Sequence, residues 1–150
     1  MPQSSPVVAV LGLGYVGLPL VVEFGRRTRT IGFDIVADKV AQCRAGTDPS
    51  REIPDAEMAL AVQAEYTSDP LALREADFIL VAVPTPVDIA HKPDFAPLIG
   101  ASRAIAPHLK PGATVIYEAA RAATRRSLCR RRRSRTPPRP CRRPSRRWRA

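Results

Sequence analysis

Three glycines with the spacing of a phosphate-binding loop are the first residues in this sequence whose chemistry can be recognised. Gly12, Gly14 and Gly17 form a Gly-x-Gly-x-x-Gly pattern directly after the apolar run 7–11. The first glycine permits a tight turn, the second lets the backbone approach a pyrophosphate, and the third allows close packing of a helix on a strand. That helix offers unpaired N–H groups and a partial positive charge to phosphates. The spacing therefore predicts a dinucleotide-binding loop.

A carboxylate follows at the distance that such a loop requires. Asp34 ends a second short run, 30–34, at 22 residues after Gly12. It can accept hydrogen bonds from ribose hydroxyls and repel a 2′-phosphate, so it predicts NAD rather than NADP as the cofactor. The alternative is a glycine-rich turn in an α/β protein that binds a different ligand. Strand, loop, helix and acid together favour the dinucleotide site.

Three further side chains have a chemical use and an ordinary alternative. Lys39 can face the adenosine side of the site or can be a solvated helix charge. Thr85 lies between two prolines after the apolar run 78–83, where ligands of open α/β sheets bind, and a turn role is an equal alternative. Cys43 is interpreted as a small core residue. We assign no catalytic residue and no metal site.

The elements that must position these residues alternate along the chain. Strands are predicted over 7–11, 30–34, 66–67, 78–83 and 113–117, and helices over 17–26, 36–45, 55–64, briefly from Pro70, and over 98–109. Gly46 is expected to stop a helix, Asp55 and Asp69 to cap helices, and Pro107 to weaken the end of one. This alternation predicts the α/β class, with a Rossmann-like doubly wound parallel sheet.

Charge divides the chain into two parts. Residues 1–119 hold 10 Lys and Arg against 14 Asp and Glu, whereas residues 120–150 hold 14 Arg and no acid. The second part is rich in arginine and proline and has no apolar periodicity, so we expect a disordered tail after a domain over 1–119. Cys43, Cys129 and Cys141 form no CxxC pair, which favours reduced thiols over a zinc site or disulfides.

The motifs around the glycine loop resemble those of the UDP-glucose/GDP-mannose dehydrogenase family. The resemblance rests on Gly-Leu-Gly-Tyr-Val-Gly-Leu-Pro-Leu at 12–20, Ile-Gly-Phe-Asp-Ile at 31–35, Thr-Ser-Asp-Pro at 67–70, Val-Pro-Thr-Pro-Val-Asp at 83–88, Lys-Pro-Asp-Phe at 92–95 and Val-Ile-Tyr-Glu at 115–118. It covers 7–119 and is greatest for the branch that oxidises UDP-N-acetylhexosamines to uronic acids for surface polysaccharides.

The resemblance implies roles for particular residues. It implies that Gly12, Gly14, Tyr15, Val16 and Gly17 hold the pyrophosphate of NAD. It also implies that Asp34 holds the ribose, that Lys39 lies near the adenosine, and that Thr85 contacts the nicotinamide side. The family oxidises the C6 alcohol of a UDP-sugar to a carboxylate in two NAD-dependent steps.

The sequence departs from the family after Glu118. The family continues with Ser-Thr-Val-Tyr-Pro-Gly, whereas this chain continues with Ala-Ala-Arg-Ala. The family's catalytic cysteine, lysine and asparagine, its dimer-building helix and its UDP-sugar domain have no counterpart, and Cys129 and Cys141 match no family position. We expect that the tail is a frameshifted reading of a GC-rich gene, which sequencing past codon 118 would test.

Two functions remain open from the sequence. The first is the NAD-binding part of a nucleotide-sugar dehydrogenase, which we expect to be inactive alone because a thiol nucleophile is absent. The second is a basic-tailed module whose 14 arginines bind nucleic acid or another polyanion without sequence specificity. Trp148 is the only aromatic residue of the tail, so stacking along bases is poorly supplied. No apolar run approaches the roughly 20 residues of a membrane span, and residues 1–6 lack the features of a signal peptide, so we expect a cytoplasmic protein.

Overall fold

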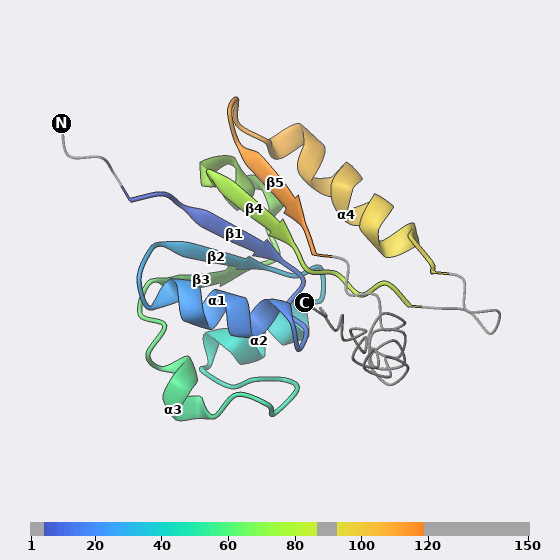
Figure 1. The fold of residues 1–150 in the computed structure, drawn as a ribbon. Helices are drawn as coiled ribbons and strands as arrows, with labels where there is room; N and C mark the ends of the chain where they lie inside the picture. Colours follow the sequence, from blue (N-terminus) through green and yellow to red (C-terminus); the bar gives the residue numbers. More distant parts are fainter. Residues whose placement is uncertain (1–4, 87–92, 119–150) are drawn as a thin grey trace, which may run out of the picture. The chain divides into compact units, whose positions relative to one another are not determined.

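Five parallel strands form one sheet in the spatial order β3-β2-β1-β4-β5 (Figure 1). The computed structural model describes residues 5–86 and 93–118, and the statements below concern these residues. The strands are β1 (Val8–Leu11), β2 (Thr30–Phe33), β3 (Ala64–Thr67), β4 (Phe78–Val81) and β5 (Thr114–Tyr117). Every neighbouring pair is parallel, as the alternation of strands and helices predicts. The tail expected over 120–150 lies outside the described residues.

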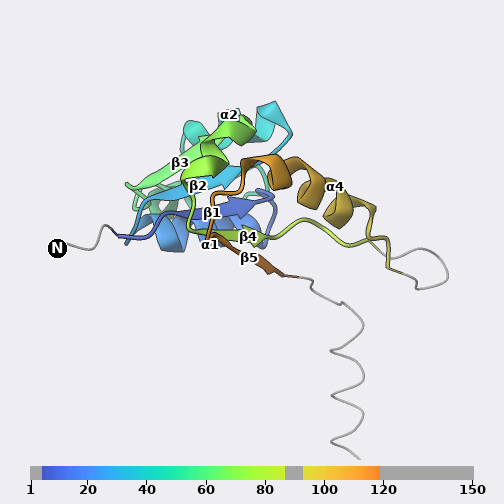
Figure 2. The ribbon, with the colours of Figure 1, turned by 90° about the horizontal axis from the view of Figure 1, so that it is seen from above.

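Helices cover both faces of the sheet. They are α1 (Gly17–Gly25), α2 (Ala37–Arg44), α3 (Asp55–Met58) and α4 (Ala96–Ile105), with the 3₁₀ turns η1 (Pro70–Glu75) and η2 (Ala106–His108). Side chains of α1, α2 and α3 pack in the cluster on one face, and those of η1 and α4 pack in the cluster on the other. Figure 2 shows α1 and α4 on opposite sides of the sheet. Right-handed crossovers require this arrangement, because the sheet grows in one direction from β1 to β3 and in the other from β4 to β5. The doubly wound parallel sheet is confirmed.

β1 is buried on both faces because it is the central strand. Val8 and Val10 join the cluster that contains α1, whereas Ala9 and Leu11 join the cluster that contains α4. Successive side chains of a strand point to opposite faces, so a strand covered on both sides needs an unbroken apolar run. The sequence Val-Ala-Val-Leu meets that need.

The carboxyl ends of the central strands lie level with one another. Leu11 of β1 is paired with Phe33 of β2 and, on its other side, with the last residue of β4. The residues that follow, Gly12, Asp34 and Ala82, therefore begin their loops at the same edge of the sheet. The chain leaves β1 toward β2 and leaves β4 toward β5, so the connections after these two neighbouring strands run in opposite directions. Open α/β sheets bind ligands at the carboxyl edge where this reversal occurs.

The helix predicted over 55–64 is wrong beyond its first turn. α3 ends at Met58, and Ala64 already belongs to β3. The large apolar side chains expected to continue the helix do not face the core, since Leu60 is 55% exposed and Val62 is 80% exposed, and only the small Ala61 is buried there. Without a buried face a second turn gains little from packing, and Ala64 must reach its pairing position beside β2.

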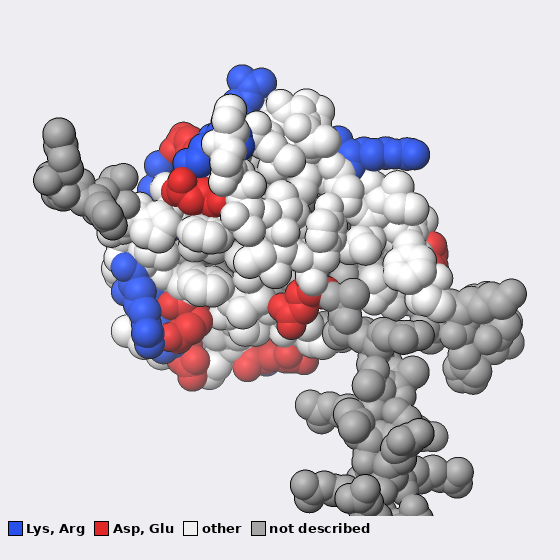
Figure 3. Space-filling view, turned by 45° about the horizontal axis from the view of Figure 1, so that its top comes forward, with Lys and Arg blue, Asp and Glu red and all other residues white. Residues whose placement is uncertain are grey.

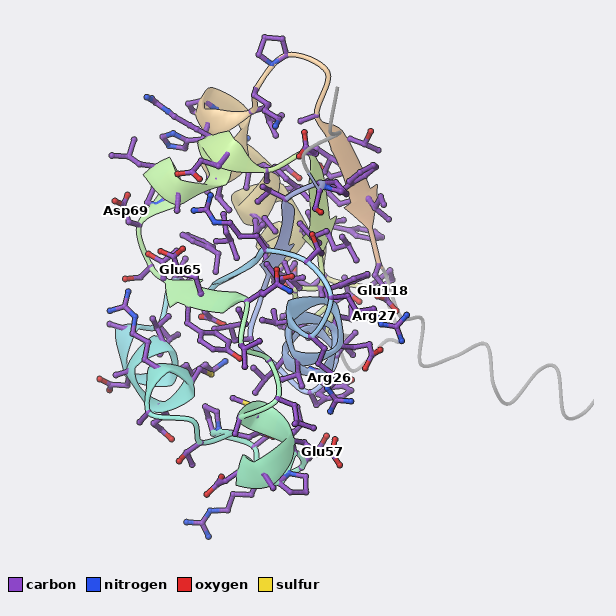
Figure 4. All side chains as sticks on the ribbon, turned by 90° about the vertical axis from the view of Figure 1, so that its left-hand side faces the viewer. Arg26, Arg27, Glu57, Glu65, Asp69 and Glu118 are labelled. Carbon is purple, nitrogen blue, oxygen red and sulfur yellow. The ribbon has the colours of Figure 1, made fainter. Side chains whose placement is uncertain are left out.

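The cap predicted at Asp55 is also wrong, because Pro54 occupies the N-cap position. The carbonyl oxygen of Pro54 accepts hydrogen bonds from the N–H groups of Glu57 and Met58 at 2.8 and 3.1 Å. Proline suits the start of a helix because it has no N–H group to leave unpaired. Arg26 at the end of α1 forms an exposed ion pair of 3.5 Å with Glu57 of the short helix, and both residues are labelled in Figure 4.

Three other helix signals are confirmed. Gly46 follows α2 with a φ of +80°, and its N–H donates to the carbonyl oxygen of Cys43 at 3.0 Å. Asp69 caps η1 by accepting a hydrogen bond from the N–H of Leu71 at 2.9 Å. α4 ends two residues before Pro107, where the chain tightens into η2.

The two edges of the sheet differ in how they are covered. At the β3 edge, Nε of Arg44 donates a hydrogen bond of 2.7 Å to the carbonyl oxygen of Tyr66. At the other edge no residue of β5 is buried, and Ile116 and Tyr117 are 45% and 48% exposed. Figure 3, which brings the top of Figure 1 forward, shows a broad uncharged surface in the middle of the view. Most side chains of β5 and α4 are therefore at least partly exposed, and Ile105 is the buried residue of α4.

Asp77 ties three segments together at the amino edge of the sheet. Its carboxylate accepts a hydrogen bond of 2.8 Å from the N–H of Val7 and forms an ion pair of 2.6 Å with Nζ of Lys110. The hydrogen bond with Lys110, and then that with Val7, lowers the pKa of Asp77 below its ordinary value. The start of β1 and the turn before β5 are thereby fixed beside β4.

Candidate cofactor-binding site

The loop after β1 makes its tight turn at Gly12. This residue has a φ of +95°, a conformation that side chains other than glycine rarely adopt. A Cβ atom here would lie 2.9 Å from the carbonyl oxygen of Ala82, so there is also no room for one. The N–H of Gly12 donates to the carbonyl oxygen of Phe33 at 2.8 Å. The turn is therefore fixed between the ends of β2 and β4.

The other two glycines of the loop face different surroundings. Gly17 begins α1 against the turn itself, where a Cβ atom would lie only 1.8 Å from the carbonyl oxygen of Gly12. At Gly14 no atom lies within 4 Å of the position of a Cβ atom. The turn and the close helix packing predicted from the spacing are thus present. Gly14 leaves the side of its backbone open, as a pyrophosphate would require.

The first turn of α1 has no side-chain cap among the described residues. Val16 is at the N-cap position, and the N–H of Leu18 donates to the carbonyl oxygen of Gly14 at 2.9 Å. Tyr15 is 68% exposed, whereas Val16 packs partly against the core. An uncapped helix start offers its N–H groups to an anion.

Asp34 holds the loop as well as facing the site. The residue is only 7% exposed, and its carboxylate accepts hydrogen bonds from the N–H of Leu13 at 2.8 Å and from the N–H of Val36 at 2.9 Å. Since two carboxylate oxygens provide about four acceptor positions, acceptor capacity remains for ribose hydroxyls. One side chain thus positions the glycine loop and provides a candidate ribose acceptor.

Lys39 faces the same site from α2. Its Nζ lies 3.7 Å from Oδ2 of Asp34, and its side chain is 40% exposed. At that distance and exposure the ion pair contributes little to stability. Both interpretations of Lys39 from the sequence, the adenosine side of the site and a solvated helix charge, are compatible with this position.

Asp34 and Lys39 line a pocket of about 470 Å³, a size typical of small-molecule sites. The pocket is bounded by the ends of β1, β2 and β4 and by α4. Its lining residues are Leu11, Gly12, Phe33, Asp34, Ile35, Val36, Lys39, Val83, Pro84, Pro97, Gly100, Ala101 and Ala104. Of the eight residues predicted from the sequence, three line this pocket. The rest of the glycine loop adjoins Gly12, and Thr85 follows the pocket-lining Pro84 without lining the pocket itself.

The sequence matches a known family over most of its length. The family model for the UDP-glucose/GDP-mannose dehydrogenase family, NAD binding domain, covers residues 7–128. The chain belongs to this family. The resemblance inferred from the motifs is therefore confirmed, and NAD is the cofactor of the domain.

Several relatives of this domain are named for N-acetylated nucleotide sugars. The UDP-N-acetyl-D-glucosamine 6-dehydrogenase of Pseudomonas aeruginosa is 45% identical over 111 residues, which are 74% of this chain and 26% of that protein. The UDP-N-acetyl-D-mannosamine dehydrogenase of Escherichia coli K12 is 39% identical over 119 residues, covering 77% of this chain and 28% of that protein. The chain thus spans about a quarter of the length of these curated relatives.

A solved structure gives the same assignment from the fold. The crystal structure of NDP-N-acetyl-D-galactosaminuronic acid dehydrogenase from Methanosarcina mazei Go1 superposes with a TM-score of 0.69 and 27% identity, covering 78% of this chain and 28% of that one. The Rossmann-like fold expected for this dehydrogenase family is confirmed.

The sequence alone missed the contribution of α4 to the site of this dehydrogenase domain. Pro97, Gly100, Ala101 and Ala104 all line the pocket. Their spacing of three and four residues places them on one helix face, which was the only signal available. Small apolar side chains carry no chemistry that marks a binding site. Only the folded structure shows that this face and the end of β2 line the same pocket.

Cys43 is a core residue, as predicted, and lies outside this pocket. It is 2% exposed, and burial, with the nearby charge of Asp48, raises the pKa of its thiol to about 11. Such a thiol is protonated and inert at neutral pH, so it is no candidate for the family's nucleophile. Cys129 and Cys141 lie outside the described residues.

Two other classes of site have no support within residues 5–86 and 93–118. Over these ranges no three or more His, Cys, Asp or Glu side chains come together as metal ligands. In the same ranges, every helix is too short or too polar to cross a bilayer.

Proposed function

We propose that this chain binds NAD through the loop 12–17 and the carboxylate of Asp34, with Lys39 beside the adenosine and Thr85 on the nicotinamide side. The observation that carries the proposal is the convergence of Gly12, Asp34 and Lys39 on one pocket next to an uncapped helix start. NAD is favoured over NADP because a 2′-phosphate would meet the buried charge of Asp34.

The test compares Asp34→Asn with Asp48→Asn. Asp48 is a matched control because it is also buried and accepts hydrogen bonds from three backbone N–H groups, those of Ser50, Glu52 and Ile53, outside the pocket. Each variant loses part of a buried hydrogen-bond set, which costs about 1–3 kcal/mol of stability. Isothermal titration should show that NAD binding weakens about 10-fold or more in Asp34→Asn only. Equal weakening in both variants would contradict the assigned role of Asp34.

For the longer proteins that this chain resembles, we propose NAD-dependent oxidation of the C6 hydroxyl of a UDP-N-acetylhexosamine to the uronic acid. The two relatives that are named for UDP-N-acetylhexosamines support this substrate class. We also propose that the 150-residue chain does not itself catalyse the reaction, because its described thiol, Cys43, is buried and protonated. Absorbance at 340 nm measures NADH formation from UDP-N-acetylglucosamine. A steady increase with the pure chain would disprove this proposal.

We further propose that the chain acts in the cytoplasm, in keeping with the free thiol of Cys43.

A second candidate function, polyanion binding, is favoured by the 14 arginines of residues 120–150. We propose that such binding has no sequence specificity and decreases steeply with salt. Titration of the intact chain with RNA distinguishes the two functions. Polyanion binding should be the same in Asp34→Asn, whereas NAD binding should not.

A further inference from the structure

We infer that β5 pairs with the β5 strand of a second copy of this chain, antiparallel and across a two-fold axis at Ile116. The inference goes beyond the proposed cofactor site, because no residue of β5 lines that pocket. It starts from the position of β5 at one end of the sheet (Figure 1), where β4 is its only neighbouring strand within residues 5–86 and 93–118. An edge strand presents backbone groups to which a further strand can bind.

The outward-facing backbone groups of β5 belong to Val115 and Tyr117. The N–H of Thr114 donates to the carbonyl oxygen of Asp77 at 2.8 Å, and the N–H of Glu118 donates to the end of β4 at 3.0 Å. Successive residues of a strand direct their backbone groups to opposite sides. The N–H and C=O groups of Val115 and Tyr117 therefore point away from β4.

These free groups are complementary to those of a second copy. In an antiparallel pair, opposing residues of the hydrogen-bonded kind exchange both of their N–H···O=C bonds. A two-fold axis at Ile116 places Val115 opposite Tyr117 of the second copy, so every outward group of both residues finds a partner. Ile116 then faces its own counterpart, with the two Cα atoms about 4.5 Å apart. An axis through Val115 would instead place Tyr117 opposite Ala113, whose N–H is already engaged in the turn before β5.

The side chains of the edge suit contact between identical copies. Natural proteins protect an edge strand with lysine, proline or a bulge, and Thr114–Tyr117 contains none of these. Ile116 is 45% exposed, and Phe78 on the neighbouring strand is 40% exposed on the same face of the sheet. Pairing brings the two copies of Ile116 together on that face. It also places Thr114 opposite Glu118, so no like charges meet.

The size of the edge limits how tightly two copies can bind. Stable protein interfaces bury about 1,200–2,000 Å² in total. β5 is only four residues long, so the paired strands and their flanking side chains form a smaller interface. We therefore expect a dissociation constant on the order of 10 μM, a concentration at which monomer and dimer coexist.

Sedimentation equilibrium of the intact chain over about 1–200 μM tests for this dimer. Ile116→Lys should weaken the dimer about 10-fold or more, because it places like charges directly opposite one another. Leu60→Lys is the matched control, since it adds the same charge at an exposed apolar residue between α3 and β3. Thermal melts establish that both variants are folded. A chain that stays monomeric throughout this range, or a dimer that Ile116→Lys leaves unchanged, would overturn the inference.

Cysteine cross-linking tests the register in a chain with Cys129→Ser and Cys141→Ser. Ile116→Cys places two thiols on Cα atoms about 4.5 Å apart, which is within the range of a disulfide. Thr114→Cys is the control on the same strand and face, because its counterpart lies four residues along the opposing strand, roughly 13 Å away. After mild oxidation, non-reducing electrophoresis should show a covalent dimer for Ile116→Cys only. Equal cross-linking of the two variants, or none in Ile116→Cys, would contradict the two-fold pairing at Ile116.

Discussion

Replacement of Gly14 by alanine should separate cofactor binding from folding. No atom lies within 4 Å of the position that the new Cβ would take, and Gly14 is not among the glycines with positive φ. Alanine therefore fits the folded backbone. Since it also restricts the unfolded chain, the free energy of unfolding should rise by about 0.4–1 kcal/mol.

The same methyl group would occupy the open side of the loop, where an oxygen of the pyrophosphate must approach the backbone. Loss of one hydrogen bond to a charged group costs about 1.5–3 kcal/mol. This corresponds to an increase in Kd of about 10- to 100-fold. Isothermal titration with NAD measures the affinity, and thermal melts followed by circular dichroism measure the stability of the same sample.

Gly17→Ala provides the contrasting result. Its Cβ would lie 1.8 Å from the carbonyl oxygen of Gly12, which is a backbone atom and cannot rotate away. The free energy of unfolding should fall by about 3 kcal/mol or more, since the helix must move away from the turn. The reasoning is refuted if Gly14→Ala binds NAD as tightly as the unchanged chain, or if it melts earlier as Gly17→Ala should.

Three further predictions concern stability and reactivity. The pKa of Asp77 is lowered on folding, so its contribution to stability is present above the unfolded value of about 3.9 and is lost as the pH falls through the lower folded value. Urea unfolding of Asp77→Asn should therefore show a weaker loss of stability as the pH falls below about 4. An unchanged loss would contradict this. With a pKa of about 11, the Cys43 thiol is ionised to about one part in a thousand at pH 8. In a chain with Cys129→Ser and Cys141→Ser, a disulfide reagent should therefore label Cys43 only on unfolding, and labelling of the folded chain would show the opposite. Gly100→Ala should raise the free energy of unfolding by about 1 kcal/mol, because it replaces glycine inside α4 without a clash, and a lower melting temperature would refute this.

The strands and the loop could be predicted because their signals are local. An unbroken apolar run such as Val8–Leu11 is needed only where a strand is covered on both faces. Glycine at position 12 is required by its φ and by its contact with Ala82. At each of these positions the residue type itself indicates the structure that it is needed for. The strand and the loop can therefore be recognised before the fold is known.

Features that depend on distant segments could not be predicted. Nothing in the residues after Met58 indicates that the chain must stop its helix and pair with β2. The hydrogen bond from Leu13 to Asp34 joins residues 21 positions apart and depends on the register of β1 against β2. The pocket face of α4 likewise has meaning only when that helix lies beside the end of β2.

The double attachment of Asp34 has a consequence for how cofactor preference can change. A basic residue in place of the ribose-binding acid would favour NADP, because it attracts a 2′-phosphate where the acid repels it. In this chain the same replacement would also release the N–H of Leu13, and with it the backbone that leads to Gly14. A successful redesign must therefore supply a new acceptor for that N–H. Selection for a different cofactor would have to change at least two positions together, which makes NAD preference resistant to single substitutions.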